Sequence, residues 1–294
     1  MIASPAPLQL RLDHLQPFPW EALLAFLARR AIPGVEEVEA GSWRRIVSLD
    51  GRSGWVEVRP DGQGAALVAT VDPSLADRLV PLAARLRRLF DLDADPLGID
   101  AHLATDEALR PSVERLPGLR VPGAVDGFEA AVRAILGQQV TVKGATVLAG
   151  RLAERFGTET GTPFAGLRRI FPTPAIVAAA GAGEVARLGM PGARAHAIVE
   201  LASAVDGGLR LEPGVPIDST LEQLRALPGF GEWTTHYVAM RALSWANAFP
   251  AADLGIRKAL GGMKPKEALS RAERWRPWRS YATLRLWEHG GLRG

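Results

Sequence analysis

The stretch LPGFGEWTTHYVAMRAL, residues 227–243, carries the pattern that decides the fold. It follows the helical pattern DSTLEQLRAL at 218–227, so the sequence predicts two helices joined by the tight turn PGFG. We expect Gly229 and Gly231 to let the backbone adopt positive φ angles and approach another molecule closely. The amides that open the second helix lack partners inside that helix, and with the helix dipole they form a site for an anion such as a phosphate. A plain glycine turn without a ligand is the competing interpretation.

The composition allows a polyanion as partner and excludes cysteine chemistry. The chain has 294 residues, of which 47% are apolar, enough for a core in one large domain or two to three smaller ones. The formal net charge is +3 and the sequence pI is about 9.7, which permits polyanion binding. The absence of cysteine excludes disulfides, thiolate metal sites and cysteine-ligated iron–sulfur clusters. None of the histidines has the spacing of a metal site: His14, His102, His196, His236 and His289.

The sequence shows no sign of export or membrane insertion. The first residues, MIASPAPLQLRLDH, have no long apolar core after a basic start, so we expect no signal peptide. No run of about 18 apolar residues is present, and a membrane span is therefore not expected. These features are typical of a protein of the reducing cytoplasm.

The first third of the chain predicts an antiparallel sheet. Three short strand-like runs lie within residues 44–71. Asp50-Gly51 and Asp61-Gly62 separate these runs, and Asp-Gly is a strong signal for a hairpin turn. The natural arrangement is an antiparallel meander.

Helices are expected on either side of the strand-like runs. Residues 19–32 have helical periodicity, and residues 74–92 resemble an amphipathic helix in which Pro81 is a possible kink or break. The segment DADPLGID at 93–100 marks a plausible boundary, so we expect a first α+β domain over 1–96.

Residues 97–294 predict an all-α second domain, and the fold class is therefore α+β. Thr173 and Pro174 are suited to the N-cap and the first position of a helix. The predicted helical segments are 126–157 (two helices joined near 137–140), 171–180, 191–205, the hairpin at about 218–243, and roughly 264–274 and 277–289.

The motifs of this helical part resemble those of one family. The order leucine, proline, glycine, apolar residue, glycine and then a Thr/Ala-rich helix resembles the helix-hairpin-helix element of DNA glycosylases. VPGAVDGFEAAVRAILGQQV, FPTPAIVAAA, LGMPGARAHAI and AERWRPWRSYATLRLW resemble 3-methyladenine DNA glycosylase II, the alkylation-repair branch of that superfamily. The N-terminal pattern fits the extra α/β domain of that branch, so the resemblance covers nearly the whole chain.

This resemblance implies a function in base-excision repair. We expect a hydrolase that flips alkylated bases such as 3-methyladenine or 7-methylguanine out of double-stranded DNA and cuts the N-glycosidic bond. The resemblance further implies a monomeric, cytoplasmic, nucleoid-associated enzyme that requires no cofactor.

Asp253, in the segment ANAFPAADLGIRKAL at 246–260, matches the essential aspartate of the family. A fixed carboxylate in a dry cleft stabilises the oxocarbenium-like sugar that forms as the base leaves, and it can orient or deprotonate the attacking water. An N-cap of the helix that follows is the alternative role, and both roles can hold together.

Trp233 occupies the position at which strand-cutting members of the superfamily carry a lysine. That lysine serves as an amine nucleophile, and a tryptophan cannot form a Schiff base. The sequence GEWT therefore indicates a monofunctional glycosylase that leaves an abasic site.

Four aromatic residues are candidates for the base pocket. Trp233 and Tyr237 lie four positions apart and therefore on one helix face. The resemblance places Trp287 and Phe26 beside them. Electron-rich rings attract a cationic base with about 0.5–2 kcal/mol each. Ordinary core packing is the alternative, and for Tyr237 and Phe26 the two roles are about equally supported.

The segment ILGQQVT predicts a polar turn between two helices, with Gln138 and Gln139 at its centre. In the family this turn enters the minor groove, and matching positions make Gln139 the wedge that fills the gap left by the flipped nucleotide. Some relatives have leucine there. A solvated turn without function is the alternative.

The resemblance also implies a monovalent cation, Na⁺ or K⁺, at the hairpin. Its ligands would be the backbone carbonyls of Arg225, Leu227 and Gly229. The amides of Gly229, Gly231 and Thr234 are the expected phosphate donors.

Two other functions remain open at this stage. A non-catalytic sensor of distorted or alkylated duplex DNA would use the same scaffold, although Asp253 argues against it because an acid repels phosphates. A glycosylase for oxidised or mismatched bases is disfavoured by the missing lysine and the missing cluster cysteines.

Overall fold

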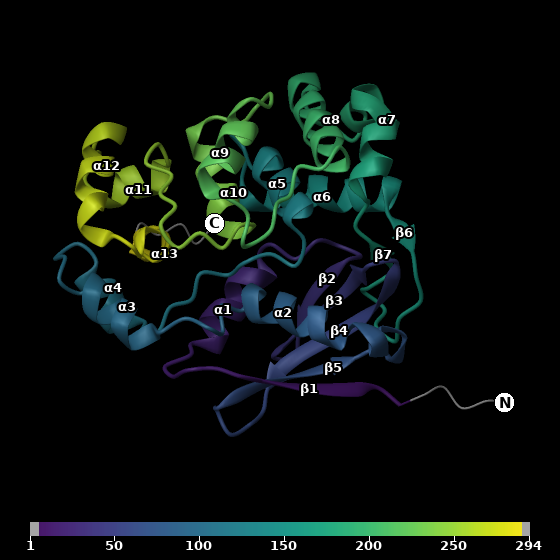
Figure 1. Cartoon of the computed structure of the whole chain (residues 1–294), viewed down its shortest axis with the longest axis horizontal. Coiled ribbons are helices and arrows are strands. Elements are labelled where there is room, and N and C mark those ends of the chain that lie inside the picture. The colour runs from purple at the N-terminus through teal and green to yellow at the C-terminus, as the bar shows by residue number, and fades with distance from the viewer. Residues whose placement is uncertain (1–5, 290–294) are drawn as a thin grey trace.

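A five-stranded antiparallel sheet forms the N-terminal part of the computed structural model, which describes residues 6–289 (Figure 1). The strand order is β1-β5-β4-β3-β2. The strands are β1 (Leu8–Asp13), β2 (Glu36–Glu39), β3 (Ser42–Leu49), β4 (Arg52–Pro60) and β5 (Ala66–Val71). The predicted meander is confirmed as β3-β4-β5, with Asp50 and Gly51 at positive φ in its first turn. β1 and β2 were not predicted: β1 pairs with β5, which is remote in sequence, and the β2–β3 turn at Ala40 and Gly41 has no Asp-Gly pair.

Two helices cover one face of this sheet. These are α1 (Trp20–Ala28) and α2 (Leu79–Leu89), and their leucines share one core with alternate residues of β3, β4 and β5. The prediction of one helix over 74–92 is wrong at its start, since a 3₁₀ helix, η1 (Pro73–Arg78), precedes α2. Pro81 lies in the first turn of α2, where a missing amide breaks no helical hydrogen bond.

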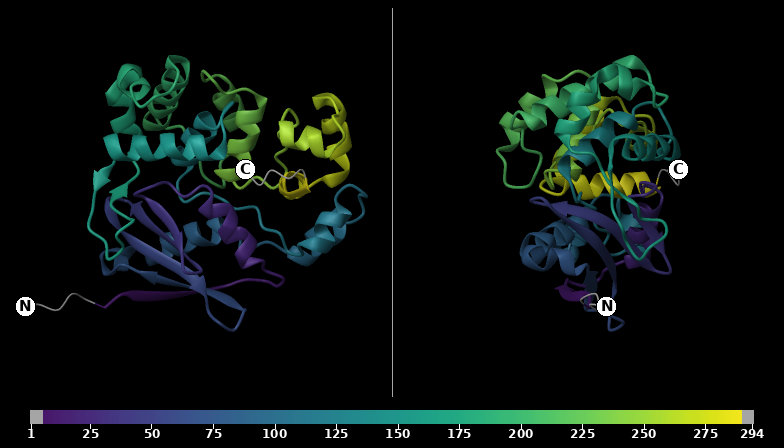
Figure 2. Two further views of the ribbon diagram at one scale, coloured as in Figure 1. Left: turned by 180° about the vertical axis from the view of Figure 1, so that it is seen from behind. Right: turned by 90° about the vertical axis from the view of Figure 1, so that its right-hand side faces the viewer.

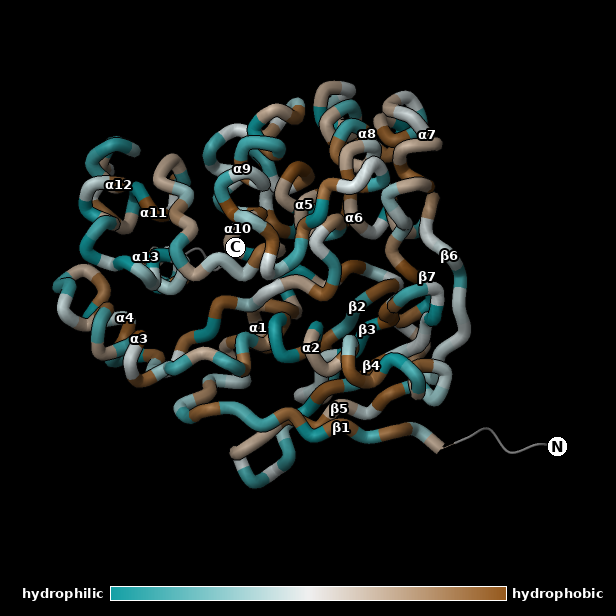
Figure 3. Tube along the Cα trace, in the orientation of Figure 1, coloured by the Kyte–Doolittle hydropathy of each residue, from teal (hydrophilic) through white to brown (hydrophobic). Residues whose placement is uncertain are grey.

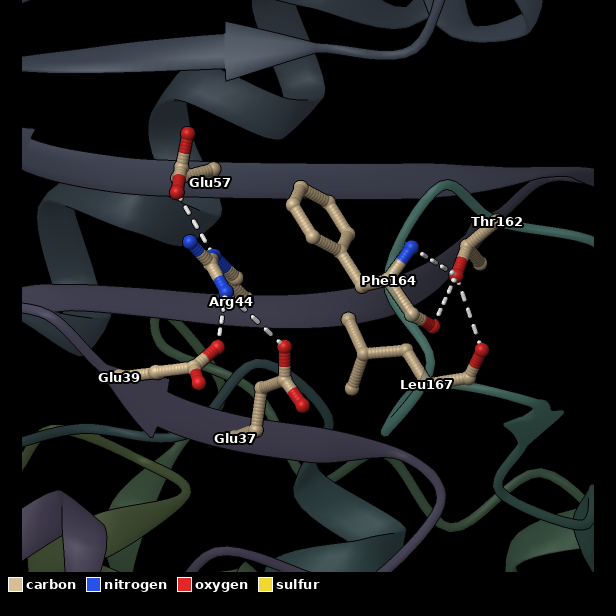
Figure 4. A network of polar contacts seen from close by, with 7 residues as sticks. All are labelled: Glu37, Glu39, Arg44, Glu57, Thr162, Phe164 and Leu167. Carbon is tan, nitrogen blue, oxygen red and sulfur yellow. Dashed lines mark hydrogen bonds and ion pairs between the residues drawn. The ribbon is translucent and has the colours of Figure 1, made fainter.

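A loop from the helical part packs on the opposite face of the sheet (Figure 4). The Phe164 ring lies 4.5 Å from the Arg44 guanidinium and 5.2 Å from the Trp55 ring. Glu57 accepts from Arg44 at 2.7 Å, and Thr162 shapes the loop by accepting from the Phe164 amide at 3.1 Å. This contact ties the sheet to residues more than a hundred positions later.

The rest of the chain is helical and lies along one side of the sheet (Figures 1 and 2). The prediction that strands disappear after residue 97 is wrong in one detail, because a two-stranded ribbon joins β6 (Thr158–Glu159) to β7 (Arg169–Ile170). The helices are α3 (Pro96–Leu103), α4 (Arg110–Arg115), α5 (Gly127–Leu136), α6 (Val142–Phe156), α7 (Pro174–Ala186), α8 (Gly192–Asp206), α9 (Ile217–Arg225), α10 (Glu232–Arg241), α11 (Leu254–Ala259), α12 (Pro265–Ala272) and α13 (Arg279–His289). The α+β fold class is confirmed.

Hydrophobic residues occur in short runs along both parts of the chain (Figure 3). They form two clusters, one between the sheet and its two helices and one among the later helices. The two clusters do not separate at one point of the sequence. Ile32 and Val35 pack in the cluster among the later helices, and Val125 packs in the cluster between the sheet and its helices. Within residues 6–289, no helix is both long and apolar enough to span a membrane.

Buried polar contacts join the two parts. Arg45 of β3 binds Glu36 and Glu129 of α5, and all three side chains are buried. Asp91, just after α2, accepts hydrogen bonds from the Tyr281 hydroxyl at 2.8 Å and the Val121 amide at 3.0 Å. Burial raises the pKa of Asp91 to about 6, although both hydrogen bonds oppose the shift.

The buried Asp91 predicts a pH-dependent contribution to stability. Its pKa is about 6 in the folded chain and about 3.9 in an unfolded one. Between these values the folded state holds more protons, so the stabilisation is complete at low pH and is lost as pH rises through 6. We expect the difference in unfolding free energy between wild type and Asp91→Asn to fall by roughly 2 kcal/mol from pH 4 to pH 7. Urea unfolding across this range measures it.

Asp206→Asn is the control for the loss of one carboxylate, since Asp206 is exposed and is not among the charged groups that act on Asp91. Its difference from wild type should change far less over this pH range. A constant difference between wild type and Asp91→Asn would contradict the assignment.

Candidate active site

A cleft of about 1410 Å³ lies between α1, the α5–α6 turn, the α9–α10 hairpin, α11 and α13. It brings together side chains from both parts of the chain. The predicted site residues that line it are Phe26, Gln138, Gln139, Gly229, Gly231, Trp233, Thr234, Tyr237, Asp253 and Trp287. Arg225 and Leu227, predicted as carbonyl ligands of a cation, do not line it.

Asp253 is the N-cap of α11, and three donors fix its carboxylate. Oδ1 accepts from the Ile256 amide at 2.9 Å and from the Trp287 indole nitrogen at 2.9 Å. Oδ2 accepts from the Trp233 indole nitrogen at 2.7 Å. The N-cap role is therefore present in the structure, and it leaves the half-buried carboxylate in the cleft wall with a fixed orientation.

The aromatic residues form one continuous wall. The Trp233 and Tyr237 rings are stacked, with centroids 5.3 Å apart and planes at 20°. Tyr237 and Trp287 lie 6.2 Å apart at 37°. All three side chains are half-buried, so each combines packing with a surface toward the cleft.

Phe26 differs from the tryptophans because a guanidinium covers its ring. The Arg30 carbon Cζ lies 3.7 Å from the Phe26 centroid, and Arg241 Cζ lies 5.0 Å away. The indole rings are therefore better placed than Phe26 to receive a base by stacking.

Arginines around Tyr237 make this end of the cleft cationic. Arg241 donates to the Tyr237 hydroxyl at 3.2 Å. Burial opposes ionisation of the phenol, but Arg241, Arg30 and Arg133 outweigh it and lower the pKa of Tyr237 below its usual value. Burial also lowers the pKa of Arg30 to about 10.

The sequence analysis did not identify these arginines, nor Arg29 and Lys258. Arg29, Arg30, Arg133 and Lys258 line the cleft. No motif marks them. One local signal is the four-residue spacing of Tyr237 and Arg241 on α10, which places both on one helix face.

The hairpin has the predicted helix–turn–helix form. The amides of Gly229, Gly231 and Thr234 donate no hydrogen bond within residues 6–289, as a phosphate site requires. The prediction of positive φ holds for Gly229, at 77°, and is wrong for Gly231, whose φ is −76°. Gly231 is the N-cap of α10 and adopts an extended conformation open to any residue.

This difference predicts unequal effects of two alanine substitutions. Gly229→Ala should destabilise the fold by about 1–2 kcal/mol, because alanine disfavours positive φ and its Cβ would lie 3.0 Å from that of Ala197. Gly231→Ala meets nothing within 4 Å and should change stability by less than about 1 kcal/mol. Urea unfolding of both variants tests this. Equal losses would contradict the role of the Gly229 backbone.

The turn between α5 and α6 presents its two glutamines differently. Gln139 is exposed and has φ of 57°, whereas the Gln138 side chain points into the protein and bonds to the hairpin. Gln139 is thus the side chain of the pair that is free to reach outward.

The carbonyls predicted to bind a cation are compatible with such a role. Leu227 and Gly229 each accept one hydrogen bond, from the Phe230 amide and the Gln138 side chain, and a carbonyl oxygen has two lone pairs. In the described part of the chain, the Arg225 carbonyl accepts none outside its helix.

Family models match both parts of the chain. Residues 9–126 match the AlkA N-terminal domain, and residues 132–280 match the HhH-GPD superfamily base excision DNA repair proteins. The helical part, which contains the helix-hairpin-helix element, thus matches a known class of base excision repair protein. The chain belongs to the HhH-GPD superfamily of base excision DNA repair proteins.

Sequence similarity to two relatives extends over nearly the whole chain. DNA-3-methyladenine glycosylase 2 of Escherichia coli (strain K12) is 37% identical over 94% of this chain and 95% of its own length. The "Probable bifunctional transcriptional activator/DNA repair enzyme AlkA" of Mycobacterium tuberculosis is 41% identical over 97% of this chain. This chain spans only 58% of that relative's length.

Solved structures have the same fold. The 3-methyladenine DNA-glycosylase from Archaeoglobus fulgidus has a TM-score of 0.83 and 26% identity, and the alignment covers 96% of this chain and 98% of that one. The Clostridium acetobutylicum 8-oxoguanine glycosylase/lyase, in complex with double-stranded DNA, has a TM-score of 0.73 at 17% identity, covering 97% of each chain.

Proposed function

We propose that this chain is a DNA glycosylase that hydrolyses the N-glycosidic bond of alkylated bases, of the 3-methyladenine and 7-methylguanine type, in double-stranded DNA. The observation that carries the proposal is the carboxylate of Asp253, held by three donors beside an aromatic wall. The name of the Escherichia coli relative supports the substrate class.

The geometry suits a reaction in which the base departs before water adds. A flipped cationic base stacks on the indole faces of Trp233 and Trp287 and leaves with the electron pair of the glycosidic bond. The sugar then carries positive charge, which the Asp253 carboxylate stabilises. Water adds to C1′ and loses a proton, and Asp253 is placed to orient that water or to accept the proton.

A panel of duplexes carrying methylated, deaminated or oxidised bases tests the substrate class. We expect the methylated purines to be released fastest, because their ring charge makes them good leaving groups and attracts the indole rings. Preferential release of an oxidised base would contradict the proposal. Affinity for duplex DNA should also fall steeply with salt, since phosphate contacts release counterions.

The enzyme is proposed to be monofunctional because Trp233 stands where a lyase needs an amine. We expect no borohydride-trapped covalent complex when the enzyme is incubated with a methylated duplex at neutral pH, while the free base accumulates. Denaturing electrophoresis after reduction measures this. A trapped adduct would overturn the assignment.

The remaining parts of the proposal concern partners and ions. The enzyme acts as a monomer on nucleoid DNA in the cytoplasm and requires no cofactor for the reaction. The carbonyls of Arg225, Leu227 and Gly229 would hold a monovalent cation that bridges the hairpin to a DNA phosphate.

A further inference from the structure

The Gln138 side chain connects the α5–α6 turn to the α9–α10 hairpin through two hydrogen bonds. Its Nε2 donates to the carbonyl of Gly229 at 2.8 Å and to Oγ1 of Thr234 at 2.9 Å. Because a carbonyl can only accept, the amide must turn its NH₂ group toward the hairpin. Both protons of that group are then used inside the protein. Gln138 therefore links two segments that are 91 residues apart in the sequence.

A second contact holds the backbone of the same residue. Arg194 of α8 donates from Nη2 to the Gln138 carbonyl at 2.6 Å. The next residue, Gln139, is exposed and has φ of 57°, a conformation that L-residues with a side chain disfavour. Such a conformation persists only where the surroundings hold it. Gln138, fixed at both its side chain and its carbonyl, is the neighbour that holds it.

We propose that Gln138 is a positioning residue that keeps Gln139 in a fixed position relative to the hairpin. Phosphate binding by the hairpin and insertion of Gln139 into the gap left by the flipped nucleotide are then coupled. This inference rests on the proposed function, which assigns phosphate binding to the hairpin and the gap of the flipped nucleotide to Gln139. In this role Gln138, which also lines the cleft, acts through its hydrogen bonds to the hairpin. Thr234 contributes twice, since its amide faces the phosphate site and its hydroxyl accepts from Gln138.

Two substitutions of Gln138 test the link in different ways. Gln138→Glu keeps the size but turns an oxygen toward the Gly229 carbonyl, and Gln138→Met removes the donor without adding charge. For both, we expect affinity for a duplex with a tetrahydrofuran abasic-site analogue to fall about tenfold. Affinity for the same duplex without the lesion should change less than twofold, because it depends on phosphate contacts alone. Fluorescence anisotropy at fixed salt measures both constants.

Gln223→Glu is the control for charge, since Gln223 is exposed on α9 and its side chain donates to the Ser219 carbonyl of its own helix. It should retain the wild-type ratio of the two affinities. A double-mutant cycle adds Thr234→Val. This substitution should lower the ratio of the affinities for the duplex with and without the lesion in the wild-type background, and should change it little in the Gln138→Met background.

If Gln138→Met weakens the affinity for both duplexes equally, Gln138 has a structural role only and the proposal is overturned. Affinities equal to those of wild type would overturn it too. If Gln138→Glu does not fold, as judged by its melting temperature, Gln138→Met carries the test. The measurement needs no base release. A wild-type protein that binds the abasic analogue preferentially but releases no base would refute the proposed function and leave this test intact.

Discussion

Replacing Asp253 by asparagine should lower single-turnover release of a methylated base by roughly 10²- to 10³-fold, because a neutral amide no longer stabilises the charged sugar. The amide oxygen can still cap α11 through the Ile256 amide. With the oxygen in that place, which Trp287 also uses as its acceptor, the NH₂ group replaces Oδ2 and faces the indole donor of Trp233, so that indole loses its acceptor. Quench-flow or discontinuous base-release assays at saturating enzyme measure the rate.

Duplex binding distinguishes catalysis from damage sensing in the same variant. We expect Asp253→Asn to bind an abasic-analogue duplex at least as well as wild type, since the carboxylate repels nearby phosphates. Asp95→Asn is the matched control, because Asp95 caps α3 in the same manner outside the cleft. Release at the wild-type rate by Asp253→Asn would refute the mechanism. A fall in binding large enough to account for the fall in release would make Asp253 a binding residue and not a catalytic one. A wild type that binds the duplex but releases no base would support the non-catalytic sensor.

The second large fall in base release is expected for substitutions of Trp233, because its indole makes two contacts in the cleft. It stacks on Tyr237 and donates to Oδ2 of Asp253 at 2.7 Å. Trp233→Phe keeps the ring and removes the donor, and a hydrogen bond to a charged group contributes about 1.5–3 kcal/mol. We therefore expect release to fall by about tenfold or more. Trp233→Ala also removes the stacking surface and should lose roughly a further tenfold.

Trp245→Phe controls for the exchange of rings. Trp245 stacks on His236 at 6.0 Å and lies outside the cleft, so its replacement should leave base release near the wild-type rate. Single-turnover rates for the variants should be compared at equal folded fractions, checked by urea unfolding. If Trp233→Phe matched wild type, the indole hydrogen bond would contribute nothing. If Trp233→Ala did so too, Trp233 would be a packing residue.

The helical hairpin and the central strands could be predicted because their signals are local. Asp-Gly pairs define turns over two residues, and the PGFG turn lies between two segments of 3.6-residue periodicity. The errors occur where local signals compete or are absent. Pro81 indicates that the helical pattern is interrupted but not where the helix begins. β1 depends on β5, a partner remote in sequence, and β2 pairs with β3 across a turn at Ala40 and Gly41 that has no Asp-Gly pair.

The conformations of the two hairpin glycines show the same limit. Either residue can adopt positive φ, so the sequence alone does not say which one does. The packing of Ala197 on α8 against Gly229 belongs to the tertiary structure, and Gly231 is left as an ordinary N-cap.

The sequence by itself determined the fold class, the hairpin, the N-cap position of Asp253 and the chemistry excluded by a tryptophan at position 233. These depend on residue type and on spacings of a few residues. Only the tertiary structure decided that two indoles from α10 and α13 hold one carboxylate, and that Gln138 points inward while Gln139 faces outward. Those contacts join residues 20, 34 and 91 positions apart, and packing of whole elements sets such distances rather than any local preference of the chain.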